Sequence, residues 1–279
     1  MLFTALLFAA LQSSPPPRPS PSVEMTYVGG PTALIEIDGL RILTDPTFDP
    51  VDPAPAKDAF LVKTMGPAIA LEDIGPIDLV LLSHDEHLDN LDNLGRGLLK
   101  SVKQTLTTEG GAARLKGNAT GLKVWGTRSI KTPNGRTLKV TALPARHGPP
   151  GIEKVAGEVI GFMLTLQETK QDLVYVTGDT VWYEQLEEVS SKYRPQAVLV
   201  FAGAAAPLPA PLRVTMDAND AIEVAHAFKN SVVVPIHYEG WAHFRQDATG
   251  MQKAFEMLGL GKRFLKLEAG VKTKVERSN

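Results

Sequence analysis

Residues 83–90, with the sequence Ser-His-Asp-Glu-His-Leu-Asp-Asn, hold the side chains best suited to chemistry in this chain. Two imidazoles and three carboxylates fall within six consecutive positions, from His84 to Asp89. The run follows the apolar stretch 77–82, whose continuous hydrophobic character predicts a buried strand. Because neutral imidazole and ionised carboxylate are the groups that bind zinc-like ions, such a cluster at a strand end indicates half of a divalent-metal site.

Other polar residues follow predicted strands in the same way. Asp45, His147, Asp179 and His237 each come shortly after an apolar run rich in β-branched residues. Polar residues at the same end of neighbouring strands converge on one rim of a sheet, where loops carry function on a rigid frame. We therefore expect these four residues to join residues 84–89 in one site.

The elements that must position these residues alternate between short strands and helices. The patterns predict strands over 24–28, 33–37, 40–44, 77–83, 105–108, 122–125, 137–143, 158–166, 173–177, 197–201, 231–236 and 264–267. They predict helices over 91–102, 110–115, 182–190, 217–229 and 245–258. Each β-rich half of the chain finishes with helices. This order favours an α/β fold in which two mixed sheets pack face to face with helices on the outer faces, an αββα sandwich.

Residues 1–22 differ from the rest of the chain. They form an apolar stretch followed by a Pro- and Ser-rich stretch, and we exclude them from a single predicted domain over 23–279. One interpretation is a signal peptide, which would make the protein periplasmic or secreted. The other is a mis-called start with Met25 as the first residue, which would make it cytoplasmic. The apolar stretch is too short for a stable membrane span.

Composition excludes several classes of function. The net charge is -2 and no basic stripe occurs, so a nucleic-acid partner has no electrostatic support. The chain has no cysteine, which removes disulfides, thiolate ligands and a cysteine nucleophile. A small-molecule substrate remains as the expected partner, and the oligomeric state is not indicated.

The order of these residues resembles the metallo-β-lactamase superfamily. The resemblance rests on His84-x-x-His87-x-Asp89-Asn90, then His147, Gly178-Asp179 and His237, and covers almost the whole chain from Met25 onward. The runs 43–48 and 82–85 look like the branch of metal-dependent hydrolases that includes lactonase-like proteins and the N-acylphosphatidylethanolamine phospholipase D type. The superfamily fold is an αββα sandwich, in agreement with the pattern above.

The resemblance implies which residues bind metal. It implies that His84, His87 and His147 hold a first divalent ion. Asp89 and His237 would hold a second ion, and Asp179 would bridge the two. Zinc is the expected metal, with manganese as an alternative.

One departure from the family pattern concerns the spacing of these residues. The usual signature is His-x-His-x-Asp-His, whereas here the second histidine comes one residue late and Asn90 stands at the last position. Treating Glu86 as an insertion keeps His87 as a ligand, and we favour this register. The other register makes Glu86 the ligand and leaves His87 outside the site. Asn90 offers only a neutral oxygen, so the second ion would bind weakly or be absent.

These assignments predict a metal-dependent hydrolase. A metal-activated water would attack a small ester, lactone or phosphodiester, with Asp179 positioning the nucleophile. His243 or a water would protonate the leaving group, and Asp45 would orient a ligand imidazole. The Pro- and Ala-rich loops 46–70 and 203–214 would form apolar pocket walls. The alternatives are a nuclease of the same superfamily, or a non-catalytic metal-binding module with a decayed site.

Overall fold

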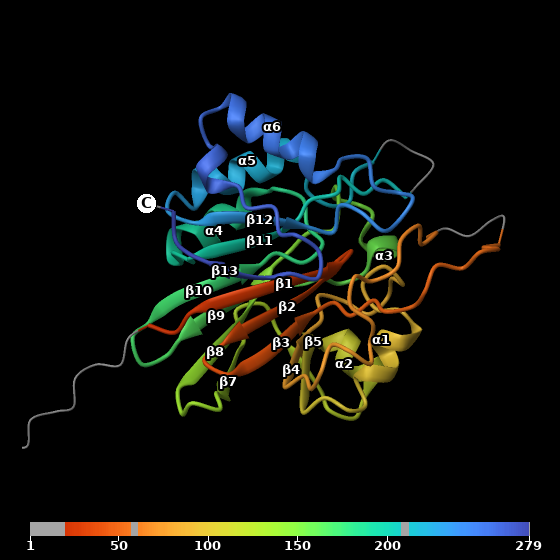
Figure 1. The fold of residues 1–279 in the computed structure, drawn as a ribbon, viewed down its shortest axis with the longest axis horizontal. Helices are drawn as coiled ribbons and strands as arrows, with labels where there is room; N and C mark the ends of the chain where they lie inside the picture. Colours follow the sequence, from red (N-terminus) through yellow and green to blue (C-terminus); the bar gives the residue numbers. More distant parts are fainter. Residues whose placement is uncertain (1–19, 57–60, 208–211, 279) are drawn as a thin grey trace, which may run out of the picture.

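Two β-sheets packed face to face form the centre of the molecule (Figure 1). The computed structural model describes residues 20–56, 61–207 and 212–278. The first sheet has the order β13-β1-β2-β3-β4-β5-β6, with β1 Val23–Gly29, β2 Thr32–Ile37, β3 Leu40–Thr44, β4 Leu79–Leu81, β5 Gln104–Thr108, β6 Ala119–Leu122 and β13 Lys272–Val275. The second has the order β12-β11-β10-β9-β8-β7, with β7 Thr127–Lys131, β8 Thr137–Pro144, β9 Ile160–Leu166, β10 Gln171–Val176, β11 Ala197–Phe201 and β12 Val232–Ile236.

Both sheets are mixed. In the first sheet β1, β2 and β3 pair antiparallel, whereas β3, β4, β5 and β6 pair parallel. In the second sheet β7 to β10 pair antiparallel, whereas β10, β11 and β12 pair parallel. The predicted α/β sandwich of two mixed sheets is therefore confirmed.

Alternation along the strands builds the core. Side chains of successive strand residues point to opposite faces of a sheet. In β4, Leu79 and Leu81 belong to the main core between the sheets, whereas Val80 belongs to a second cluster with Leu91 and Leu99. The first sheet is thus buried on both faces, which explains why residues 79–82 are apolar without interruption.

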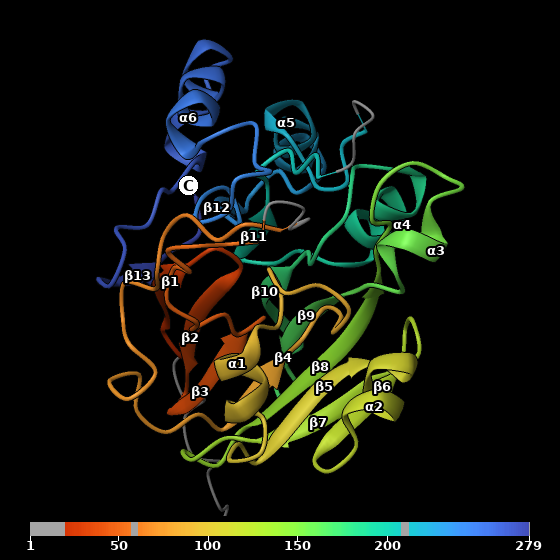
Figure 2. The same cartoon turned by 90° about the vertical axis from the view of Figure 1, so that its right-hand side faces the viewer.

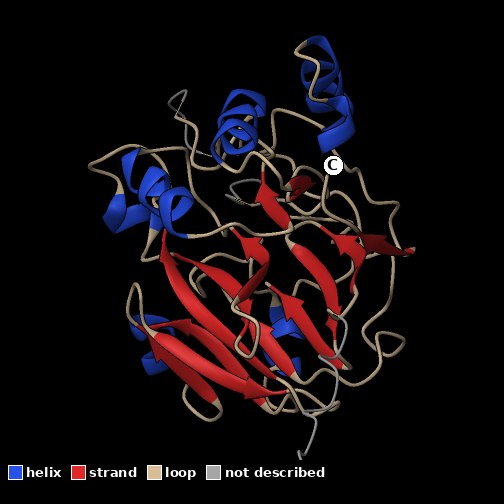
Figure 3. Ribbon diagram, turned by 90° about the vertical axis from the view of Figure 1, so that its left-hand side faces the viewer, coloured by secondary structure: helices blue, strands red, loops and turns tan. Residues whose placement is uncertain are grey.

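Helices cover the outer faces of the sheets. α1 Asn93–Leu98 and α2 Glu109–Leu115 lie on the side of the first sheet, and α4 Glu184–Lys192, α5 Ala218–Ala227 and α6 Ala248–Met257 lie on the side of the second (Figure 2). The short α3 Glu153–Ala156 and a 3₁₀ turn, Gly261–Arg263, complete the described helices. The strands occupy the middle of the molecule and helices its periphery (Figure 3). None of the helices in the described part of the chain is long and apolar enough to span a membrane.

Several predicted elements were wrong in extent or place. The strand expected over 77–83 is only Leu79–Leu81, and the helix expected over 91–102 is only Asn93–Leu98. Residues 264–267 do not form a strand, and Phe264 makes only an isolated bridge to Val233. The strand expected over 122–125 ends at Leu122, because Trp125 takes a left-handed backbone conformation with a φ of 69°.

Candidate metal centre

The polar residues singled out in the sequence lie at the carboxyl ends of parallel strands. β3 and β4 are parallel neighbours, and Asp45 and His84 follow them. β8, β10 and β12 share one direction in the second sheet, and His147, Asp179 and His237 follow them. Because parallel strands end at the same rim of a sheet, these segments meet although they are far apart in the sequence.

Four of the residues form a compact cluster. His84, His87, His147 and Asp179 each offer one ligand atom, and these atoms all lie within 4.8 Å of one another. His87 Nδ1 lies 3.0 Å from His84 Nε2 and 3.3 Å from His147 Nε2, and His147 Nε2 lies 3.5 Å from Asp179 Oδ2. Bonds of about 2.0–2.1 Å to a tetrahedral ion place ligand atoms about 3.3–3.4 Å apart. The cluster therefore fits a zinc-like ion.

Neighbouring groups aim two of these imidazoles at the cluster. His147 Nδ1 lies 2.6 Å from the carbonyl oxygen of Val214 and must donate its proton there, which leaves Nε2 free to bind an ion. Ser83 Oγ lies 3.0 Å from His84 Nδ1 and donates to Asp45 Oδ1 at 2.8 Å. Asp45 thus reaches a ligand imidazole through Ser83, whose backbone N–H also donates to it at 2.8 Å.

The electrostatics of the cluster suit a cation. Burial lowers the pKa of His84 well below its ordinary value and also lowers that of His147, so both imidazoles are neutral and have a lone pair to offer. Burial alone would raise the pKa of Asp179, but the charge of His237 and its hydrogen bond to Asp179 lower that pKa instead. Asp179 is therefore ionised, and the imidazoles of His84 and His147 beside it are neutral, as metal ligands must be.

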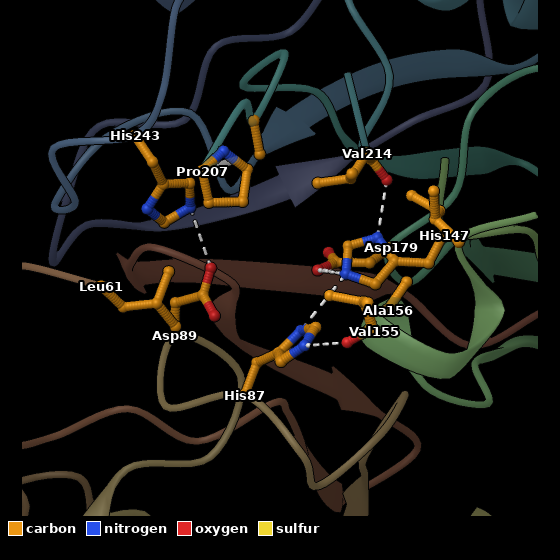
Figure 4. A pocket seen from close by; sticks show the side chains of 12 residues that line it. Leu61, His87, Asp89, His147, Val155, Ala156, Asp179, Pro207, Val214 and His243 are labelled. Atoms are coloured by element: carbon orange, nitrogen blue, oxygen red, sulfur yellow. Dashed lines mark hydrogen bonds and ion pairs between the residues drawn. The ribbon is translucent and has the colours of Figure 1, made fainter. Parts of the chain in front are cut away.

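A second group of polar residues adjoins the first. Asp89 Oδ2 lies 3.0 Å from His243 Nε2 and 3.5 Å from His237 Nε2, and the Asp89–His243 contact is drawn in Figure 4. Asp179 Oδ1 lies 2.8 Å from His237 Nδ1. The structure thus places Asp89, Asp179, His237 and His243 side by side.

The two registers of the histidine motif differ in whether His87 or Glu86 is the ligand, and the two side chains have different contacts. His87 points into the cluster (Figure 4), whereas the Glu86 carboxylate lies 2.5 Å from Arg114 Nη2 and outside the cluster. Arg114 also binds Asp85. Asn90 is fully buried, and neither of its amide atoms has a hydrogen-bond partner among the described residues.

A small cavity of about 30 Å³ opens beside the two groups. Its polar part consists of side chains from both groups, and its walls are apolar: Leu61, Ile152, Val155, Ala156, Ala205, Pro207 and Val214 (Figure 4). Leu61, Ala205, Pro207 and Val214 come from the loops 46–70 and 203–214, which the sequence predicted as pocket walls. The wall around α3 was not predicted from the sequence, because a four-residue helix leaves no periodic pattern.

Comparisons with known proteins agree with this geometry. Residues 40–238 match the β-lactamase superfamily domain. A metal-dependent hydrolase of Methanopyrus kandleri is 26% identical over 255 residues, which cover 89% of this chain and 98% of that protein. The isothiocyanate hydrolase from Delia radicum gut bacteria shares the fold with a TM-score of 0.75 and 19% identity, covering 91% of this chain and 99% of that one. A metallo hydrolase from Ignicoccus hospitalis has a TM-score of 0.69 and 22% identity, with the same coverage.

The chain therefore belongs to the family of β-lactamase superfamily domains. With its relatives and its cluster of imidazoles and carboxylate, it is a metal-dependent hydrolase of that superfamily.

Proposed function

We propose that the protein hydrolyses a small, neutral ester or lactone with a zinc ion held by His84, His87, His147 and Asp179. The observation that carries this proposal is the meeting of four ligand atoms within 4.8 Å of one another beside an apolar cavity. Imidazole nitrogens and carboxylate oxygens are zinc ligands, and a zinc ion can expand to five-coordinate, which would leave room for a water beside these four groups. Manganese prefers sites richer in oxygen, so zinc fits this donor set better.

The chain's own residues have distinct roles in this proposal. When bound, a zinc-like ion lowers the pKa of a water molecule and polarises the carbonyl group next to it. Asp179, kept ionised by its neighbours, presents Oδ2 to the ligand cluster and also orients His237 through Oδ1. The apolar cavity walls exclude bulk water from the ester group. His243 Nε2 faces Asp89, which leaves a water as the leaving group's proton donor.

The charge of the cavity favours a neutral substrate. No lysine or arginine is among the described residues that line it. Arg146, the basic residue nearest His147 in the sequence, packs over the ring of Tyr183 at 4.4 Å and lies 3.9 Å from Glu184. A phosphodiester would bring a full negative charge into this cavity without a cation from the protein, so an ester or lactone is the better fit.

A substrate screen tests this proposal. The purified protein, stripped of metal and reloaded with zinc or with manganese, is assayed on short neutral esters, lactones, an isothiocyanate and phosphodiesters. The isothiocyanate is included because it too is a small neutral electrophile and a protein of the same fold hydrolyses such a compound. We expect kcat/KM on the best ester or lactone to exceed that on any phosphodiester by at least about 100-fold, the scale of a buried uncompensated charge. A preference for phosphodiesters, or for manganese, would contradict the proposal.

A further inference from the structure

We propose that His243 is a ligand of a second metal ion, together with Asp89 and His237, and that it supplies the imidazole that Asn90 does not provide. This inference extends the proposed metal centre and rests on it. It gives His243 a role different from the proton donor that the sequence suggested. It also predicts a complete second site where the sequence predicted a weak or missing one.

Two imidazole nitrogens lie close to one carboxylate oxygen of Asp89. His243 lies in the loop between β12 and α6, 5% exposed, and its Nε2 is 3.0 Å from Asp89 Oδ2. His237 Nε2 is 3.5 Å from the same oxygen. Both distances lie close to the roughly 3.3–3.4 Å that separates two ligands of a tetrahedral zinc ion. One carboxylate and two imidazoles, with room for a water, are also a common ligand set of catalytic zinc sites.

Buried polar atoms without a hydrogen-bond partner gather at the same place. Among the described residues, His237 Nε2 and Asp89 Oδ1 are buried and have no hydrogen-bond partner. A buried polar atom without a partner costs about 1–3 kcal/mol, so native proteins rarely keep several in one place. An ion between Asp89 and the two imidazoles would satisfy the His237 nitrogen.

A hydrogen bond to Asp179 fixes the orientation of His237. Its Nδ1 lies 2.8 Å from Asp179 Oδ1. The ionised carboxylate can only accept, so Nδ1 must donate its proton. Metal binding releases the proton of a ligand nitrogen, so in the metal-bound ring the lone pair would lie on Nε2, the atom that faces Asp89. Ligand histidines in proteins are commonly held by such a carboxylate on the other nitrogen.

A single aromatic side chain packs against both imidazoles. The ring of Phe244 lies edge to face against His237 at a centroid distance of 4.8 Å and contacts His243 at 4.5 Å. Both histidines are therefore positioned by packing before any ion binds. Such preorganisation is expected of ligands and is not needed for a surface histidine.

Metal stoichiometry tests the proposal without any activity assay. The protein is stripped with a chelator, loaded with zinc, freed of excess ion and analysed for zinc per chain. We expect two ions in the unchanged protein and one in both His243→Ala and His243→Gln. Asn90→Ala and His226→Ala, which alters an exposed histidine on α5, should keep two. The visible spectrum of the cobalt-loaded protein should lose the contribution of one site in the His243 variants only.

The outcomes separate this inference from the proposed function. Loss of a ligand should weaken the second ion by more than about 100-fold, since changes in groups that merely orient ligands already cost 10–100-fold. Two ions in both His243 variants would overturn the inference, as would a single ion in the unchanged protein. Neither result would affect the first site. Uptake of no ion at all would overturn the proposed function itself. Circular dichroism checks that the variants fold, and the near-isosteric glutamine variant decides the matter if the alanine variant does not.

Discussion

Asp45 and Ser83 form a line of contacts that ends at the His84 imidazole, so the orientation of His84 depends on two residues outside the metal-ligand cluster. Asp45 Oδ1 accepts from both the backbone N–H and the hydroxyl of Ser83, and that hydroxyl lies 3.0 Å from His84 Nδ1. Asp45 and Ser83 are fully buried. They therefore fix the orientation of an imidazole without touching the place of the ion.

We expect Ser83→Ala to lower zinc affinity about 10- to 100-fold, because His84 loses its orienting partner while the ligand set stays complete. Competition with a chromophoric chelator measures the affinity. Ser101→Ala is the matched control, since Ser101 is exposed and its hydroxyl bonds the carbonyl of Leu98 at the end of α1. Equal affinities in the two variants would contradict the orienting role of Ser83.

The pH dependence of the metal-free protein follows from the buried imidazoles. Burial lowers the pKa of His84 and of His147 from the ordinary 6.5. Below that pH the unfolded chain binds protons that the folded chain does not. These two groups should therefore lower the free energy of unfolding as the pH falls from about 6.5 to about 5, by up to about 1.4 kcal/mol per pH unit for each group. Buried Asp45, whose pKa is raised by burial, acts in the opposite direction.

His237 does not cancel this effect. Burial would lower its pKa, but Asp179 raises it to about 10. Its contribution is complete below pH 6.5 and is lost as the pH rises toward 10. Urea unfolding of the metal-free protein across this acid range measures the slope, and His84→Ala should reduce it. An unchanged slope in the His84→Ala variant would refute the account of the buried imidazoles.

At the scale of the elements, the residues of the site follow the ends of strands. Most of these strands were predicted from the sequence. The apolar runs before Asp45, His84, His147, Asp179 and His237 were recognisable because buried strands of a sandwich are continuous in apolar residues. The partner of His147 Nδ1 was not predictable, because it is the backbone carbonyl of Val214 and any side chain could stand there.

The missed strands, β7 and β13, have a common physical reason. Both are edge strands, in which most residues are exposed or half-buried, and both contain lysines. Such strands are held by backbone pairing rather than by apolar burial, so no hydrophobic pattern marks them. Residues 264–267 carried the apolar pattern instead, because Phe264 and Leu265 pack on the core without joining a sheet.

The turn after β10 leads to a prediction at this scale. Gly178 has a φ of 64°, and a Cβ there would lie 2.8 Å from both the Ile160 carbonyl oxygen and Ser83 Cβ. Gly178→Ala should therefore cost about 2–4 kcal/mol of stability and weaken zinc binding, because both the strained turn and the clash displace Asp179.

Gly117→Ala separates the effect of the strained backbone conformation from the effect of the steric clash. Gly117 has a similar φ of 59°, but a Cβ there would meet nothing within 4 Å. It should cost only about 1–2 kcal/mol and leave zinc affinity unchanged. Urea unfolding and chelator competition on both variants check this, and equal effects would show that the clash near Ser83 is unimportant.

At the scale of the whole molecule, the two sheets and their covering helices depend on the start of β1. Val23 is fully buried and pairs with Ile37 in β2 and with Val275 in β13. β1 thus begins two residues before Met25 and joins the ends of the described chain in one sheet.

A chain beginning at Met25 should be less stable than one beginning at Ser20. Burial of a valine side chain stabilises by about 1.5–3 kcal/mol, and the shorter chain also loses the pairing of Glu24 with β2 and β13. The free energy of unfolding should fall by at least about 2 kcal/mol, as measured in urea. Equal stabilities would show that the first residues of β1 contribute little.

The most direct test of the metal centre is zinc content in the unchanged protein and in His84→Ala and Asp179→Ala. We expect at least one ion to survive chelator-free dialysis in the unchanged protein, and each variant to hold one ion fewer and to lose hydrolysis with it. A folded protein that takes up no transition metal under any loading condition would contradict the account.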